Sequence, residues 1–424
     1  MNYMDEARFA FIHLRERKRQ TFLTALGVAV GSAMLVTTIA VARGSSANVI
    51  AKVIDTSPHV LVKAERVVPL VPDNLAARQA GTVSMVTKNV TPDKKDLIKN
   101  YSGVVESIRQ LDELQSISPF VVSKVIARNR TRVTPCQVRG VTPALEANIA
   151  GLKKNLLDKN ALDELAYTSN GIVLGDLLAK KLRAGYRDRI VLVTQKSEEF
   201  PVTVVGRFSS GFNAKDEREA YVNLALAQKM EDIVANSVSG IGLRTSHVER
   251  ARETALKVQE MSGYVSESWD ETNRNVIEFY NRNAVITLVL VGFVFIVAGL
   301  GVSSVMTTVV LQKVKDIAIL RSMGVQRGSI TRIFMLEGFM IGVIGVLFGS
   351  PVGHVICHFV SSIRFVASTA GVLKSDRINL IETLDAHLIV IGFGILISVI
   401  SSLNPARKAT RYLPVRILRG EVGG

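Results

Sequence analysis

Two histidines and a cysteine lie close together in an apolar stretch near the C-terminal end, and theirs is the spacing most suited to chemistry. His354 and His358 are four positions apart, so a helix would bring both imidazoles to one side, next to Cys357. Two histidines placed in this way could bind a metal ion or haem. Because no carboxylate or other fixed ligand is near them in the sequence, we interpret them as polar residues that face neighbouring helices, and we predict no metal site.

The rest of the sequence offers little catalytic chemistry. The G-x-x-x-x-G-K-[ST] motif of a phosphate-binding loop does not occur, and the Ser, His and Asp residues of the central region are scattered. The single tryptophan, Trp269, is interpreted as a core or interface residue. We therefore predict no catalytic residue and no directly bound cofactor.

The elements that position these residues are long apolar runs. The first covers residues 21–42, and three more follow at 284–311, 338–360 and 386–403. A helix of about 20 residues crosses the ~30 Å hydrocarbon core of a bilayer, so each run is a candidate transmembrane helix. The first run is longer than the apolar part of a signal peptide, so we interpret it as an uncleaved signal anchor. Small residues after it leave cleavage as the alternative.

Lysine and arginine are concentrated in three short segments. Residues 1–20, 312–332 and 404–424 hold five each, whereas residues 361–385 hold three. Short basic segments stay in the cytoplasm, so both termini are predicted to be cytoplasmic and the large region after the first run to lie outside. The net charge of +15 is thus mainly a consequence of topology, with some attraction to anionic membrane lipid, and no nucleic-acid motif accompanies it.

These patterns predict an α-helical membrane protein with one span, a large external domain and then three spans. In chain order we expect a cytoplasmic amphipathic helix (1–20), a first span (21–42), an extracytoplasmic α+β domain with helical stalks (43–283), a second span (284–311), a cytoplasmic loop (312–332), a third span (333–360), an external loop (361–385), a fourth span (386–403) and a cytoplasmic tail (404–424).

The external domain is long enough to form its own core without a disulfide, since Cys136 and Cys357 lie in different regions. Residues 67–92 are proline-containing and predict a loop. The absence of Gly and Pro from 273–280 predicts a continuous helix into the second span. We expect two subdomains, in which strands from both ends of the domain pair. Strands are predicted at 59–64, 117–127, 132–140, 189–194, 202–208, 220–223 and 238–243, and helices at 93–107, 176–183, 224–233 and 246–261.

The loop between the second and third spans has helical periodicity. Ile317, Leu320 and Met323 recur at helical spacing among charged residues, and Gly324 and Gly328 interrupt the pattern before the third span. We predict a short amphipathic helix on the cytoplasmic face with these three residues as an apolar ridge. An ordinary interfacial helix is the alternative interpretation.

Several short motifs together point to one family. The string D-I-A-I-L-R-S-M-G-V at 316–325 resembles the cytoplasmic loop of FtsX-like, MacB-type ABC transporter permeases. Residues 403–409 and 414–419 resemble that family's closing P-A-R-x-A and P-V-x-x-L-R motifs. The resemblance covers essentially the whole chain, since further segments resemble the family's periplasmic core domain at 140–143, 172–175, 204–208 and 221–224.

The resemblance implies a permease subunit of a type VII (mechanotransmission) ABC transporter in a bacterial inner membrane, with the large domain in the periplasm. Its partners would be a separate ABC ATPase dimer, which would bind ATP and Mg, and a second permease protomer in a homo- or heterodimer. By position, residues 315–328 would seat the permease on the ATPase. The implied coupling residues are Lys315, Ile317, Leu320, Arg321, Met323, Gly324 and Arg327.

Glycines recur along the third span. Gly345, Gly349 and Gly353 form two consecutive G-x-x-x-G steps, and small residues at this spacing let helices approach closely in lipid. The contact so predicted is either packing within the chain or a contact between protomers.

The resemblance leaves three functions open. The layout is similar to that of lipoprotein-releasing permeases (the LolC/LolE group), which implies a substrate from the periplasm or the outer leaflet. One type in that group carries a long hairpin hook for a periplasmic carrier, where this chain has only residues 195–201. A MacB- or DevC-like efflux permease that works with a membrane-fusion protein is therefore a second hypothesis. An FtsX-like signalling permease that regulates a cell-wall hydrolase is the third.

Overall fold

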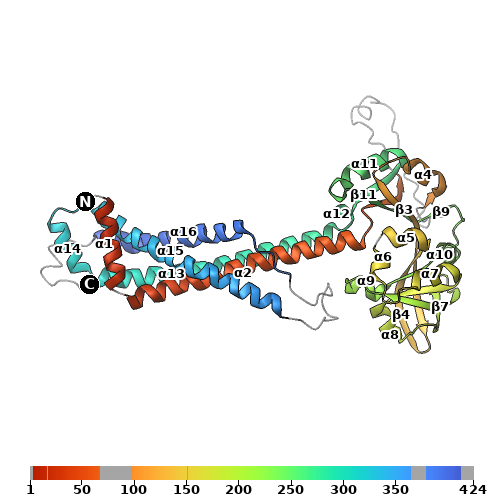
Figure 1. Ribbon diagram of the computed structural model, residues 1–424, viewed down its shortest axis with the longest axis horizontal. Helices are drawn as coiled ribbons and strands as arrows, with labels where there is room; N and C mark the ends of the chain where they lie inside the picture. Colours follow the sequence, from red (N-terminus) through yellow and green to blue (C-terminus); the bar gives the residue numbers. More distant parts are fainter. Residues whose placement is uncertain (1–2, 17, 67–96, 150, 364–378, 412–424) are drawn as a thin grey trace, which may run out of the picture. The chain divides into compact units, whose positions relative to one another are not determined.

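A computed structural model describes residues 3–16, 18–66, 97–149, 151–363 and 379–411 (Figure 1). These residues form two compact units. One is helical and is built from both ends of the chain, and the other is an α+β domain built from the middle. The predicted loop at 67–92 lies outside the described residues.

Four described helices are long and apolar enough to cross a membrane, which confirms the predicted one-plus-three arrangement. Two shorter helices, α1 (Tyr3–Glu16) and α14 (Val314–Ser322), belong to the same unit. The four long helices are α2 (Lys18–Thr56), α13 (Arg274–Gln312), α15 (Arg327–Ser362) and α16 (Leu384–Arg411).

Helices α2 and α13 are longer than a membrane crossing requires. Each has 39 residues, which at 1.5 Å per residue corresponds to about 58 Å, against a hydrocarbon core of ~30 Å. Helix α13 begins at Arg274 and is uninterrupted, which confirms the continuous helix predicted from 273–280. Both helices therefore extend well beyond their apolar runs and form stalks.

One side of α15 is closed against α2 by glycines. Gly345, Gly349 and Gly353 all face α2. A Cβ atom placed at Gly345 would lie 2.6 Å from Cβ of Val28, and one placed at Gly349 would overlap the backbone of Ala29. The structure thus places the three predicted packing glycines in a contact within one chain, where only glycine leaves room for the neighbouring backbone.

A second glycine pair on α15 meets α16. A Cβ atom placed at Gly338 would lie 2.5 Å from Oγ of Ser402, and one at Gly342 would lie 2.9 Å from Cβ of Ser398. Both serines are buried. Helix α15 is therefore held tightly on two sides, by α2 and by α16.

The α+β domain is built on a nine-stranded sheet with the order β11-β1-β10-β3-β4-β8-β5-β7-β6, together with a small separate pair, β2 and β9. Its strands are β1 (Val60–Arg66), β2 (Ile98–Lys99), β3 (Leu114–Asn129), β4 (Arg132–Val141), β5 (Gly171–Gly175), β6 (Arg189–Thr194), β7 (Glu199–Phe208), β8 (Glu219–Asn223), β9 (Ser237–Val238), β10 (Gly240–Thr245) and β11 (Tyr264–Ser268).

Strand β3 pairs with different strands along its length, all within the same nine-stranded sheet. Its first half pairs with β10 and its second half pairs with β6, while β4 runs along its other side. The strands from β3 through β4, β8, β5 and β7 to β6 therefore close into a ring, and β10, β1 and β11 extend from it. The predicted pairing of strands from both ends of the domain is confirmed, because β1 pairs with β11.

Short helices cover the sheet, and the aromatic side chains Phe208 and Tyr221 lie fully buried with ring centroids 5.2 Å apart. The predicted helix at 93–107 is partly wrong, because Ile98–Lys99 forms β2 and α4 begins only at Tyr101. The helices are α4 (Tyr101–Ile108), α5 (Pro143–Ile149), α6 (Leu152–Asn155), α7 (Ala161–Tyr167), α8 (Asp176–Leu182), α9 (Asn213–Arg218), α10 (Leu224–Glu231), the 3-10 turn η1 (Val248–Arg250), α11 (Ala251–Ser262) and α12 (Trp269–Thr272).

The close contact of α15 with α2 predicts opposite effects of the same substitution at two glycines. Gly349→Ala should lower the melting temperature, because overpacking costs roughly 1–3 kcal/mol. Gly392→Ala, in α16, is the matched control, since a Cβ there meets no atom within 4 Å and alanine favours the helix by up to about 1 kcal/mol. Thermal unfolding of the purified variants in detergent measures both. Equal melting temperatures for the two variants would contradict a tight α2–α15 contact.

Candidate functional site

The predicted cytoplasmic loop forms the helix α14, which ends at a glycine. Gly324 has a φ of +91°, a conformation that favours glycine, although no atom lies close to its missing side chain. The N–H groups of Gly324 and Val325 donate to the carbonyl oxygens of Arg321 and Leu320 at 3.1 Å each, and so close the last turn. Gly324 thus ends α14 and lets the chain turn into α15.

The inner side of α14 packs on its own chain. Val314, Ile317 and Ala318 are buried, at the i, i+3 and i+4 spacing of one helix face. Ile317 joins a cluster formed by the ends of three long helices: Val309 and Val310 of α13, Ile330 and Phe334 of α15, and Ala406 of α16.

The predicted ridge of Ile317, Leu320 and Met323 therefore needs correction. Ile317 is buried in its own chain and Leu320 is half-buried, whereas Met323 is exposed. The exposed apolar pair is Ile319 and Met323, four residues apart. Helix α14 has apolar residues on two sides, and its own chain covers one of them.

Three of the predicted coupling residues are charged. Lys315, in α14, and Arg327, the first residue of α15, are both exposed. Arg321 is half-buried, and its Nη1 donates to the backbone oxygen of Thr410 in α16 at 3.2 Å. We define the α14 outer face as the exposed residues Lys315, Ile319 and Met323, the last of which caps the helix.

An ion pair that the sequence interpretation missed anchors α1 beside this region. Glu6 is fully buried, and both of its carboxylate oxygens accept hydrogen bonds from Arg332 of α15, at 2.8 and 2.9 Å. The hydrogen bond from Arg332 lowers the pKa of the Glu6 carboxyl. The available sequence signal was weak, because Glu6 is one of only three carboxylates in a basic segment.

A second, more exposed pair joins the same parts. Lys313, between α13 and α14, lies 3.0 Å from Asp316 and 3.4 Å from Glu16 at the end of α1. The hydrogen bond to Asp316 raises the pKa of the Lys313 ammonium group. Helix α1 is thus tied to the start of α15 and to the start of α14.

The histidines of α15 have partners that the sequence did not place near them. Nδ1 of His354 lies 2.5 Å from a carboxylate oxygen of Glu382, and His387, bonded to Ser350 at 2.7 Å, lies on the other side of that oxygen at 3.8 Å. The expectation that no carboxylate lies nearby is wrong in space, because the chain returns to α15 before α16 begins. His358 is exposed. Within the described parts of the chain, no three ligating residues are arranged to hold a metal ion.

The cysteines are buried and free. Burial raises the pKa of the Cys136 thiol to about 12, so the thiolate that a nucleophile requires is scarce at neutral pH.

Comparisons with known proteins agree with this architecture. Residues 21–261 match a family model described as MacB-like periplasmic core domain, and residues 288–414 match one described as FtsX-like permease C-terminal. The chain belongs to this family of ABC transporter permeases. Its membrane helices and its α+β domain are thus the two family parts, as the short motifs indicated.

The relatives differ in what their names say. The lipoprotein-releasing system transmembrane protein LolC of Xylella fastidiosa is 25% identical over 96% of this chain and 97% of its own length. The corresponding protein LolE of Haemophilus influenzae is 22% identical over 93% of both. The macrolide export ATP-binding/permease protein MacB 2 of Aeromonas hydrophila is 23% identical over 99% of this chain and 61% of its own length.

The buried ion pair predicts a pH-dependent stability. Glu6→Gln should destabilise the helical unit at pH 7 by roughly 1–3 kcal/mol, because Arg332 loses a charged partner. Since the folded-state pKa of Glu6 lies below its ordinary value of 4.5, the pair stabilises above that pH and its contribution falls as pH drops.

Melting temperatures of wild type and Glu6→Gln should therefore converge as the pH falls below about 4. Glu16→Gln is the control. Its partner contact with Lys313 is exposed and should be worth at most about 1 kcal/mol. A difference between wild type and Glu6→Gln that does not change with pH would contradict the role given to the Glu6 carboxylate.

Proposed function

We propose that this chain is the permease subunit of a transporter in which a separate ABC ATPase drives the release of lipoproteins from the outer leaflet of the inner membrane. One observation carries the proposal. A relative named for a lipoprotein-releasing system aligns with 96% of this chain and with 97% of its own length. A second permease protomer, identical or similar, completes the complex.

The ATPase is assigned to another polypeptide. The sequence contains no phosphate-binding loop motif, whereas the MacB relative that is named ATP-binding/permease extends well beyond the part it shares with this chain. In the proposal, ATP and Mg are bound by the partner, and the α14 outer face is the docking surface. Met323 is 77% exposed and Ile319 is 51% exposed, so both are available to a groove on the ATPase.

The long helices supply the mechanical connection. Displacement of α14 reaches α13, α15 and α16 through the cluster around Ile317. Helix α13 is uninterrupted from Arg274 to Gln312, so a movement at one end moves the other. In the proposal, the substrate therefore does not pass through the protein, because a movement caused by ATP in the cytoplasm is transmitted by the helices to the domain outside.

The length of the hairpin between β6 and β7 helps to distinguish the candidate substrates. Strand β6 ends at Thr194 and β7 begins at Glu199, so only four residues connect them. No extended hook for a carrier is present there. In the proposal, the second protomer supplies the carrier contact. The short hairpin also favours the second candidate, a MacB- or DevC-like efflux permease that works with a membrane-fusion protein.

An acylated reporter distinguishes these functions. Depletion of the chain should retain a lipoprotein reporter in the inner membrane, whereas the same reporter with its acylated cysteine replaced should be secreted normally. Membrane fractionation measures both. If the acylated reporter still leaves the inner membrane and macrolide susceptibility rises, the efflux function holds and lipoprotein release does not.

The α14 outer face predicts which substitutions uncouple the ATPase. Met323→Asp should remove a buried contact worth roughly 1.5–3 kcal/mol and place a charge in the interface. The partner ATPase should then fail to co-purify, while the variant remains folded. Leu256→Asp, an exposed aliphatic position in α11, is the control.

The inner side of α14 should respond differently. Ile317→Ala should lower the free energy of unfolding of the permease itself by roughly 2–5 kcal/mol, because Ile317 is part of the core. Its melting temperature should fall accordingly. If Met323→Asp retains the ATPase at the wild-type level, α14 does not form the coupling contact through this face.

A further inference from the structure

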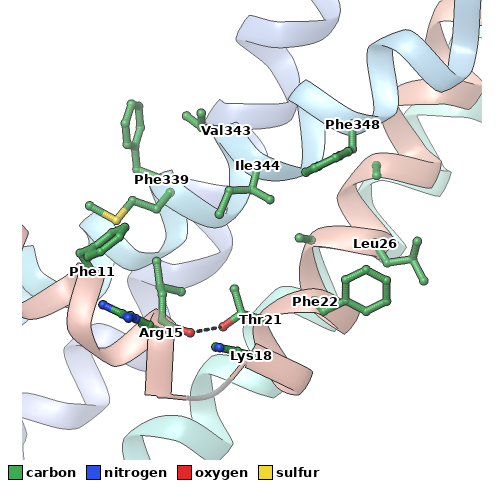
Figure 2. A pocket seen from close by; sticks show the side chains of 14 residues that line it. Phe11, Arg15, Lys18, Thr21, Phe22, Leu26, Phe339, Val343, Ile344 and Phe348 are labelled. Carbon is green, nitrogen blue, oxygen red and sulfur yellow. Dashed lines mark hydrogen bonds between the residues drawn. The ribbon is translucent and has the colours of Figure 1, made fainter.

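An apolar groove with a basic end lies between α1, α2 and α15 (Figure 2). Its volume is about 650 Å³, and its walls include Phe11, Phe22, Phe339 and Phe348. Phe11, Phe22 and Phe348 are each at least 59% exposed. A hollow this apolar on the outside of a membrane helix bundle offers its surface to an apolar chain.

Two cations mark one end of the groove. Arg15 and Lys18 lie where α1 gives way to α2, and Leu26 and Phe348 lie toward the opposite end (Figure 2). Thr21 donates its hydroxyl hydrogen to the backbone oxygen of Leu14 at 3.2 Å, which fixes the corner between the two helices.

These cations are available for an anion. Arg15 and Lys18 are both exposed, and among the described residues neither has an ion-pair partner. The adjacent carboxylate, Glu16, pairs instead with Lys313. The charge at this end of the groove is therefore positive.

The length of the groove suits one leaflet. From Lys18 to Ala29 along α2 the lining covers eleven residue steps, which at 1.5 Å per residue is about 16 Å. Half of a ~30 Å hydrocarbon core is close to this length. The basic residues would then lie at the headgroup level and the aromatic residues among the acyl chains.

We propose that this groove binds one anionic phospholipid of the leaflet on the α1 side, with its acyl chain along α2 and α15 and its phosphate between Arg15 and Lys18. The cytoplasmic leaflet, to which the basic segments assign α1, is rich in such lipids. A second copy of the chain fits the groove less well, because a twofold contact would bring the same cations together.

Brominated lipids test the proposal through quenching of tryptophan fluorescence. Phe22→Trp places a reporter in the groove, and the native Trp269 lies in the other unit. The protein is reconstituted with brominated phosphatidylglycerol or brominated phosphatidylcholine in a background of unlabelled phosphatidylcholine. Brominated phosphatidylglycerol should quench the reporter at a far lower mole fraction than brominated phosphatidylcholine does.

Charge variants test the headgroup contact. Arg15→Gln/Lys18→Gln should reduce the preference for phosphatidylglycerol by about fivefold per cation, or about 25-fold for both. Arg8→Gln/Arg19→Gln removes the same charge from exposed positions that do not line the groove, and should keep most of the preference. Equal losses in the two pairs would reduce the effect to general surface charge and overturn the site.

Two further results would overturn the proposal. Equal quenching by the two brominated lipids at every mole fraction would indicate a groove that takes acyl chains without a contact to the anionic headgroup. A reporter that neither lipid quenches would indicate that protein, such as a second copy, covers the groove. As a positive check, Val343→Trp should fill the groove and abolish the preference for phosphatidylglycerol. A tryptophan at Val289, an exposed position on α13 that does not line the groove, should show no preference between the two brominated lipids.

Discussion

The close approach of backbones along α15 is the constraint on which the helical unit depends. Lipid tails are as apolar as the helix surfaces, so burial of apolar area in a bilayer drives association weakly and shape decides the contact. Gly345 and Gly349 bring α15 against α2, and Gly338 and Gly342 bring it against α16. Because α15 has no side chains at these points, α2 and α16 can both pack closely against it. The serines of α16 occupy space that a larger residue on α15 would fill.

The polar contacts at the end of the bundle that holds α1 and α14 build on this packing. Because α15 is fixed, Arg332 has a fixed place, and Glu6 can be fully buried against it without being left uncompensated. The same end of α15 contributes to the cluster that receives Ile317. Helix α14 is therefore attached to the bundle by its inner side, and Ile319 and Met323 on its outer face stay exposed.

The sequence predicted what depends on local pattern. The four membrane helices, the stalk at 273–280 and strands such as β6 follow from length, periodicity and the absence of Gly and Pro. Strands β5 and β11 were not predicted. In β5, for example, all five residues are buried, so the sequence lacks the alternation of apolar and polar residues that identifies a strand. The inner and outer sides of α14 could not be assigned, since apolar residues lie on both and only the rest of the chain decides which is covered. The Glu382–His354 contact joins residues 28 positions apart and depends on the return of the chain.

The pairing of β1 with β11 restricts how the stalks can act. Helix α2 leads directly to β1, and β11 leads through α12 to α13, so the two stalks enter the domain at neighbouring antiparallel strands. Sliding one stalk past the other would shear this ladder, and a slip of one residue would turn every inward side chain of a strand outward. The backbone oxygen of His59, which accepts a hydrogen bond from Trp269 at 2.9 Å, adds a further link at that junction. Within the α+β unit, backbone hydrogen bonds therefore hold side by side the two chain segments that continue into α2 and α13.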